Sequence, residues 1–251
     1  MNMIEHIIEP SRLFLAWQAQ DGKGSRKRHL VAELVRQQQT VGFRYLVNST
    51  DFAEAGALGF LGYPAFNTRT AVHTNQVVET FMRRLPPRSR TDFNQYLQNF
   101  RLPPDSRLSD FALLGYTGAS LPRDGFSIIN PFDGANGPCE CLLEVAGLRY
   151  RESVSVEEIA MGEAVAFCPD PQNDFDPLAI QIYSGDKFIG YVVRGQTDAV
   201  HRWLANADIT AVVERINGDV KRPVVFVYVK VLPRYSSPMR DALEKADGRP
   251  F

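Results

Sequence analysis

The sequence contains few of the residues that bind metals or form disulfide frameworks. Its 251 residues include only 3 cysteines and 4 histidines. Cys139 and Cys141 lie close together and Cys168 is distant, so no disulfide pairing is evident and a reducing cytoplasm is the simplest setting. The scattered histidines and the C-x-C spacing do not form a zinc motif. We therefore expect a cytoplasmic protein with no metal site and no cofactor.

Long hydrophobic runs and a strong net charge are also lacking. No apolar stretch approaches the roughly 20 residues that cross a membrane, and the N-terminus does not have the pattern of a signal peptide. Apolar residues make up 44% and charged residues 23%, as in soluble globular proteins. The net charge of −1 argues against a protein that coats nucleic acid over its whole surface, but it leaves room for a local basic groove.

Motifs for phosphoryl transfer are missing. The sequence has no G-x-x-x-x-G-K-[ST], no G-x-G-x-x-G after a strand, and no kinase catalytic loop or D-F-G. Asp174 and Asp176 could be the paired carboxylates of a hydrolase or a metal-dependent nuclease, but D-x-D in a proline-rich turn more often forms or caps the turn. We therefore expect a binding protein rather than an enzyme, with no catalytic residues.

The first half of the chain alternates between strand and helix patterns. Period-two alternation predicts strands over 13–17, 30–35, 42–47 and 126–129. Helical spacing and turn residues predict four helices: one starting at 50, one over 77–85 that Pro86-Pro87 ends, one starting at Ser89 or Arg90, and one capped by Ser109 and broken at Gly115.

The second half has short strands with turn signals between them. The expected strands cover 139–145, 164–168, 178–183, 188–193, 209–216 and 224–231, with one helix over 197–206. Six such strands predict a small β-barrel of the OB or SH3 type. The segment 130–138 reads as a linker. We therefore expect an α+β fold with an interaction module over 1–133, a barrel over 139–233 and a polar tail over 234–251.

A polar loop precedes the hairpin of strands 178–183 and 188–193. It carries Asp170, Asn173, Asp174 and Asp176 among three prolines. Leu178, Ile180 and Ile182 are expected to point to one face of the following strand. Loops held by a rigid sheet often carry binding residues, so we expect this loop to form a binding site.

The same stretch resembles a HIRAN domain. N-D-F-D-P-L-A-I over 173–180 fits that family's N-x-[YF]-D-x-x-A-I segment, I-G-Y-V over 189–192 fits its second element, and G-L-R-Y over 147–150 is similar to its entry. The resemblance covers about 140–232. It implies a barrel that binds the 3′ end of single-stranded DNA, as family members in DNA-remodelling proteins do.

The resemblance also implies roles for particular side chains. Asp176 and Asn173 would engage the terminal hydroxyl, an aromatic ring would stack on the terminal base and an arginine would hold a phosphate. The expected DNA-binding residues are Arg149, Tyr150, Arg151, Asn173, Phe175, Asp176, Tyr191 and Arg194. Arg151 stands where family DNA binders carry an aromatic, and Asp174 stands where they carry a proline. The alternative is structural, with Asp176 bonded to loop amides and Phe175 in the core.

Residues 12–130 resemble the N-terminal subdomain of HipA-type serine/threonine kinase toxins and the small antitoxins that carry it as a separate chain. The similar motifs are F-R-Y-L over 43–46, G-Y-P-A-F over 62–66, F-M-R-R-L-P over 81–86 and L-S-D-F-A-L-L-G over 108–115. A kinase core does not follow. The resemblance implies a module that docks on a HipA-family kinase. The expected anchors are Trp17, Tyr63, Phe66 and Tyr116, although large aromatics are more often buried.

Two functional hypotheses follow. The first is a non-enzymatic, antitoxin-like partner of a HipA-family kinase whose HIRAN-like domain binds single-stranded 3′ ends. The alternative is a DNA-end-binding protein, in repair or phage defence, that has no kinase partner.

Overall fold

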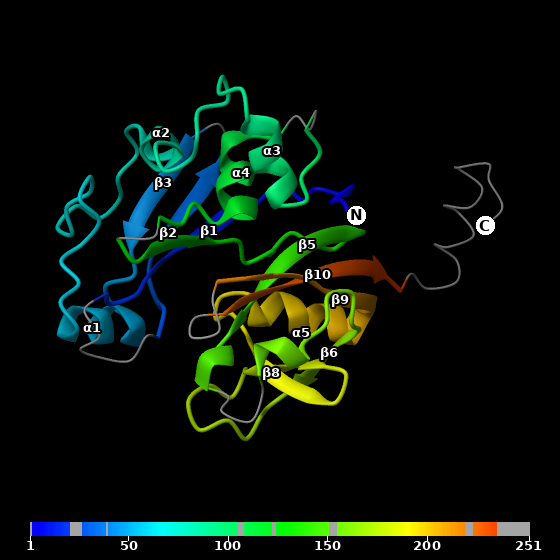
Figure 1. The fold of residues 1–251 in the computed structure, drawn as a ribbon. Coiled ribbons are helices and arrows are strands. Elements are labelled where there is room, and N and C mark those ends of the chain that lie inside the picture. Colours follow the sequence, from blue (N-terminus) through cyan, green and yellow to red (C-terminus); the bar gives the residue numbers. More distant parts are fainter. Residues whose placement is uncertain are drawn as a thin grey trace.

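The computed structural model describes residues 2–20, 27–38, 40–104, 108–121, 124–150, 155–218 and 223–234. They form a four-stranded sheet with helices and a six-stranded barrel, which lie one above the other in Figure 1. The expected α+β class, with an antiparallel sheet and helices followed by a six-stranded barrel, is confirmed.

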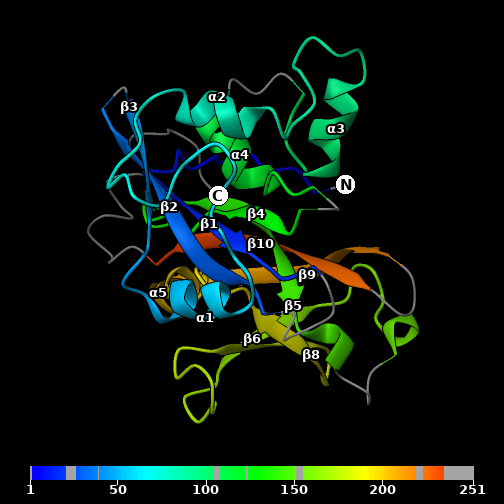
Figure 2. The ribbon, with the colours of Figure 1, turned by 90° about the vertical axis from the view of Figure 1, so that its left-hand side faces the viewer.

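The first sheet is antiparallel, in the order β3-β2-β1-β4. Its strands are β1 (Arg12–Trp17), β2 (His29–Gln37), β3 (Thr40–Tyr45) and β4 (Phe126–Ile129). Helices α2 (Val77–Met82), α3 (Phe93–Asn99) and α4 (Asp110–Thr117) lie on the side of this sheet away from the barrel (Figures 1 and 2). Helix α1 (Thr50–Ala57) packs against β2.

Helix α4 confirms one predicted boundary and corrects another. Ser109 Oγ accepts a hydrogen bond from Ala112 N (3.0 Å), as expected of an N-cap. The predicted break at Gly115 is wrong, because the helix continues to Thr117 and ends at Gly118, where φ is 71°. A Cβ at position 115 would lie 2.8 Å from Leu13 Cδ2. Glycine at 115 therefore permits close helix–sheet packing.

Two other predicted helix ends are also wrong. Helix α2 ends at Met82, before the predicted 85, and the chain continues in turns up to Pro86-Pro87. Helix α3 begins at Phe93 rather than near Ser89, because residues 89–92 form turns in front of it.

The barrel strands follow the order β6-β7-β8-β5-β10-β9. They are β5 (Cys139–Ala146), β6 (Val165–Pro169), β7 (Ile180–Ser184), β8 (Lys187–Val192), β9 (Ala207–Asn217) and β10 (Val224–Pro233). A bridge between Ala164 and Val212 brings the two edges together. Helix α5 (Thr197–Asn206), with the predicted bounds, packs on β9, and short 3-10 turns lie at η1 (Leu148–Tyr150) and η2 (Val156–Glu158).

The predicted alternation holds within strand β7 but not at its start. Ile180 and Ile182 are fully buried, whereas Gln181 and Tyr183 are half-buried. Leu178 lies before the strand begins and is 50% exposed, so its expected place on the inner face is wrong.

Gly190 allows strands β5 and β8 to approach each other. Its φ is 146°, and a Cβ there would lie 2.3 Å from Ala146 O. We expect Gly190→Ala to lower the free energy of unfolding by about 2–4 kcal/mol, measured by denaturant unfolding. Gly56→Ala is the control, because nothing lies within 4 Å of its Cβ position in α1. Gly56→Ala is expected to raise the free energy of unfolding by up to about 1 kcal/mol. An equal loss of stability in both variants would contradict the role of Gly190.

The segment 130–138 is packed, which the linker prediction did not anticipate. Its backbone carbonyls accept hydrogen bonds from α5 and the residue before it: Gln196 Nε2 to Asn130 O, Arg202 to Phe132 O and Trp203 Nε1 to Ala135 O. One continuous hydrophobic cluster includes residues from both halves. The division into 1–133 and 139–233 stays a prediction.

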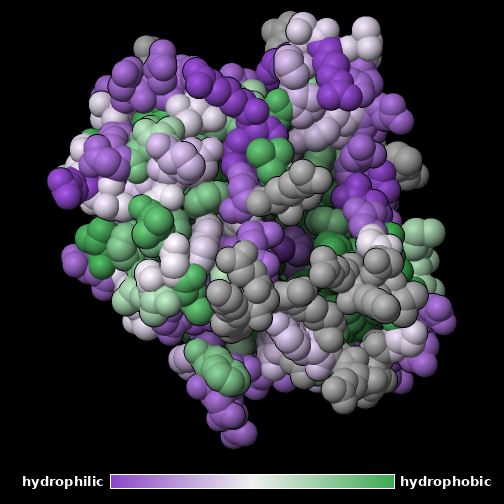
Figure 3. Space-filling view, turned by 60° about the vertical axis from the view of Figure 1, so that its left-hand side comes forward, coloured by the Kyte–Doolittle hydropathy of each residue, from purple (hydrophilic) through white to green (hydrophobic). Residues whose placement is uncertain are grey.

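The surface is mixed, and Figure 3 shows hydrophilic and hydrophobic residues side by side on one face. Among the helices in the described ranges, none has both the length and the apolar character needed to cross a membrane. The polar tail beyond Arg234 lies outside the described residues.

Candidate functional site

The loop between β6 and β7 is held by Asn173. Asn173 Oδ1 accepts hydrogen bonds from Phe175 N (3.1 Å) and Asp176 N (3.2 Å). Its Nδ2 donates to Asp170 Oδ2 (3.1 Å) and lies 3.2 Å from Tyr191 Oη. Both ends of the amide are therefore used within the protein. These contacts give Asn173 a role in positioning the loop, and its expected contact with the DNA hydroxyl stays a prediction.

Asp170 is the centre of the network below this loop. Its Oδ2 accepts hydrogen bonds from Asn173, from Gln181 Nε2 (3.0 Å) and from Tyr191 Oη (3.3 Å). These bonds, that of Asn173 foremost, lower the pKa of the Asp170 carboxyl, although burial opposes them. The carboxylate is thus ionised near neutral pH. The sequence placed Asp170 in this loop but indicated no role for it or for Gln181, because side chains that fix a loop leave no distinct motif.

Asp176 occupies the end of the loop and faces Arg194. Asp176 Oδ1 accepts a hydrogen bond from Leu178 N (2.9 Å), which supports the predicted structural alternative for this oxygen. Asp176 Oδ2 lies 3.7 Å from Arg194 Nε, an ion pair beyond hydrogen-bond distance. This second oxygen can still accept a hydrogen bond from a ligand. The side chain is partly exposed, so a ligand can reach it.

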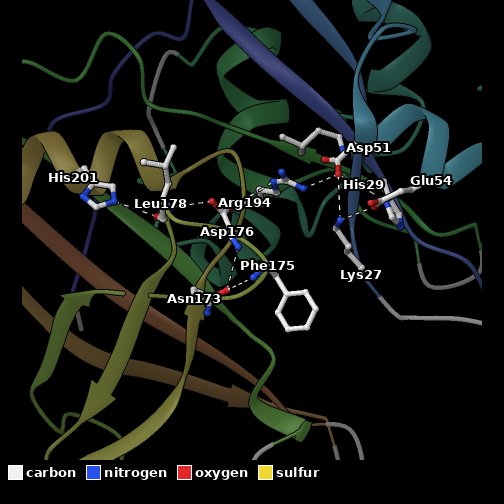
Figure 4. Close-up of polar contacts among 11 residues, drawn as sticks. Lys27, His29, Asp51, Glu54, Asn173, Phe175, Asp176, Leu178, Arg194 and His201 are labelled. Carbon is white, nitrogen blue, oxygen red and sulfur yellow. Dashed lines mark hydrogen bonds and ion pairs between the residues drawn. The ribbon is translucent and has the colours of Figure 1, made fainter. Parts of the chain in front are cut away.

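Arg194 links the loop to the first half of the chain. Its NH1 group donates to Asp51 Oδ1 (2.7 Å), and Asp51 lies in helix α1. Figure 4 shows Arg194 between Asp176 and Asp51. Both carboxylates share one guanidinium charge, so a phosphate that binds Arg194 has to compete with them.

Phe175 is the most exposed aromatic residue of this site. Its side chain is 93% exposed, and Figure 4 shows the ring extending away from the loop. The alternative that placed Phe175 in the core is wrong. The hydrogen bond from its backbone N–H to Asn173 fixes the backbone at this position. An exposed aromatic face on such a loop is suited to stack on a base.

The structure describes the side chains of only some of the remaining predicted DNA-binding residues. Tyr150 ends η1, next to strand β8, and is 60% exposed. Tyr191 is half-buried, and its hydroxyl belongs to the Asp170 network. The side chain of Arg149 and all of Arg151 lie outside the described residues, so their roles stay predictions.

The aromatics expected to anchor a kinase partner do not form an exposed surface. Tyr63, Phe66 and Tyr116 are buried. Tyr45 Oη donates to Phe66 O (2.6 Å) and accepts from Tyr63 N (2.7 Å), so the G-Y-P-A-F loop closes onto the sheet. Tyr116 Oη accepts from Ile8 N (2.8 Å).

Trp17, the fourth expected anchor, is half-buried, and its ring lies 5.4 Å from that of Phe60. The prediction of exposed anchors is therefore wrong for Tyr63, Phe66 and Tyr116, because these three side chains are part of the hydrophobic core.

Comparisons with known proteins give a family match for the barrel. No curated protein matches the chain. The crystal structure of the HIRAN domain of human HLTF is 23% identical over 45% of this chain and 91% of that chain, with a TM-score of 0.33. The family described as HIRAN domain matches residues 140–231, which contain nearly all of the six barrel strands. Residues 140–231 thus match the HIRAN domain family.

Proposed function

We propose that the protein binds single-stranded DNA at a free 3′ end, through the loop that carries Phe175 and Asp176. The observation that supports this most directly is an aromatic ring, 93% exposed, on a loop whose backbone Asn173 fixes and whose next residue carries a partly exposed carboxylate. The HIRAN match of the barrel supports the same reading.

Each group has a distinct task in this proposal. The ring of Phe175 stacks on the terminal base, and Tyr150 offers a second exposed ring on the same barrel. Asp176 Oδ2 accepts a hydrogen bond from the terminal 3′-hydroxyl, which is a donor that a terminal phosphate lacks. The carboxylate also repels a terminal phosphate.

Electrostatic attraction contributes little to this binding. The chain has a net charge of −1, and Arg194 is shared between Asp51 and Asp176. The decrease of DNA affinity with salt concentration scales with the number of phosphates that the protein neutralises. We therefore expect the affinity to depend only weakly on salt. Affinity then depends mainly on stacking and on recognition of the end.

The test compares a linear oligonucleotide with a circle of the same sequence. The full chain is bound to a fluorescent linear strand with a free 3′-hydroxyl, and unlabelled linear and circular strands compete. We expect the circle to compete at least about tenfold less well, since it offers no terminal hydroxyl and no unstacked terminal base. Equal competition by the two strands would exclude end recognition.

This proposal assigns binding alone, without catalysis, to a cytoplasmic protein. A HipA-family kinase partner stays a hypothesis that rests on the sequence resemblance of residues 12–130. Co-expression with such a kinase addresses it, and a kinase whose toxicity is unchanged and which forms no complex would contradict it.

A further inference from the structure

His29 is a buried histidine whose ring has no hydrogen-bond partner. It begins strand β2, is 2% exposed, and neither Nδ1 nor Nε2 is hydrogen-bonded. Burying a polar group without a hydrogen-bond partner is unfavourable for folding. Such a group in a native fold calls for an explanation, and a role in binding a ligand is one.

Two carboxylates of helix α1 face this ring. His29 Nδ1 lies 3.4 Å from Glu54 Oε2 and 3.8 Å from Asp51 Oδ1. One ligand atom from each of the three residues lies within 4.8 Å of the others. Figure 4 shows the three side chains converging beside β2.

These separations suit a small divalent cation. Zinc bonds to imidazole nitrogen and carboxylate oxygen are about 2.0–2.2 Å long, which in a tetrahedral site sets the ligand atoms about 3.4 Å apart. The observed 3.4 and 3.8 Å are close to that spacing. Three protein ligands with one open side are the arrangement in which zinc also binds water.

The carboxylate of Asp51 is already held in place. Asp51 Oδ2 accepts a hydrogen bond from Leu30 N (3.0 Å), and Oδ1 accepts from Arg194 (2.7 Å). Bonds of this kind to ligand carboxylates orient them toward a metal. Glu54 is half-exposed, so an ion can reach the cluster from solvent.

A positive charge occupies this position in the structure. Lys27 Nζ lies 2.6 Å from Glu54 Oε2 and 3.6 Å from Asp51 Oδ1. The ammonium neutralises the two carboxylates, but the histidine ring stays without a hydrogen bond. A divalent ion would satisfy all three groups, and Lys27, with a long and partly exposed side chain, would have to be displaced.

We propose that His29, Asp51 and Glu54 form a binding site for a divalent transition-metal ion of the zinc class, which competes with the ammonium of Lys27. Imidazole and carboxylate together favour such ions over Mg²⁺ or Ca²⁺, which prefer oxygen ligands. The site is linked to the loop that carries Phe175 and Asp176 through the ion pairs of Arg194 with Asp51 and Asp176. The proposal does not depend on DNA binding.

The experiment uses two substitutions with opposite expected effects. The full chain is freed of metal with a chelator and titrated with Zn²⁺, with Co²⁺ visible absorption as a second readout of coordination. We expect one ion per chain, at least about tenfold weaker binding in Glu54→Gln and at least about tenfold tighter binding in Lys27→Met. Glu157→Gln, an exposed acidic residue of η2, is the control with unchanged affinity.

Three results would overturn the site. The first is that neither the wild type nor Lys27→Met binds one Zn²⁺ ion per chain. The second is that Glu54→Gln binds Zn²⁺ as tightly as the wild type, and the third is that Glu54→Gln and Glu157→Gln lose equal Zn²⁺ affinity. Far-ultraviolet circular dichroism establishes that each variant is folded. Because the readout is metal occupancy, failure of this proposal is distinguishable from failure of DNA-end binding.

Discussion

Phe175→Ala is expected to weaken binding of a single-stranded 3′-hydroxyl oligonucleotide about 5- to 150-fold. Base–aromatic stacking contributes about 1–3 kcal/mol, and each 1.4 kcal/mol is about tenfold in affinity. The ring is 93% exposed, so its loss removes little buried area. We therefore expect the stability of the fold to be unchanged. Fluorescence anisotropy gives the affinity and thermal unfolding gives the stability.

The matched control for Phe175→Ala is Leu61→Ala. Leu61 has the same exposed fraction, 93%, and lies in the first half of the chain. Its removal is expected to leave DNA affinity unchanged. If Phe175→Ala stays within about twofold of the wild type, or if both variants lose affinity equally, stacking by Phe175 is not the source of binding.

Asp176→Asn is expected to abolish the preference for a 3′-hydroxyl over a 3′-phosphate. Hydrogen bonds to a charged group contribute about 1.5–3 kcal/mol, so affinity for the hydroxyl strand should fall at least about tenfold. Affinity for the phosphate strand should rise, because the repelling charge is gone. Asparagine keeps the oxygen that accepts from Leu178 N, so the turn is retained.

Asp174→Asn is the control for Asp176→Asn. Asp174 is exposed and lies two positions away, so this change removes the same charge from the same loop. A general electrostatic effect would raise affinity for both strands in both variants. Only Asp176→Asn is expected to change the discrimination between the two 3′ ends, and an equal change in Asp174→Asn would contradict a specific role of Asp176.

Local sequence patterns predicted those helices and strands whose formation depends on residues close by in the sequence. The approximate positions of the six barrel strands, the Ser109 cap and the helix over 197–206 appear as expected. Gly115 was misread because its helix is stabilised by packing against Leu13, which is about a hundred positions away in sequence. Propensity alone does not reveal such a contact.

In the candidate site, too, the sequence motif indicated some features, whereas others depend on contacts that form only in the fold. The motif over 173–180 pointed to a loop in which Phe175 and Asp176 are both accessible to solvent. The hydrogen bonds of the Asn173 amide to Asp170 and Tyr191 could not be predicted, because these partners meet it only in the folded barrel. His29 and Asp51 are likewise brought together by packing of α1 on β2.

The most direct test of DNA-end binding compares two oligonucleotides of one sequence, ending in a 3′-hydroxyl or a 3′-phosphate, on the wild-type chain. We predict that the hydroxyl strand binds at least about tenfold more tightly, because Asp176 accepts a hydrogen bond from the hydroxyl and repels the phosphate. Equal dissociation constants for the two strands would contradict the proposal.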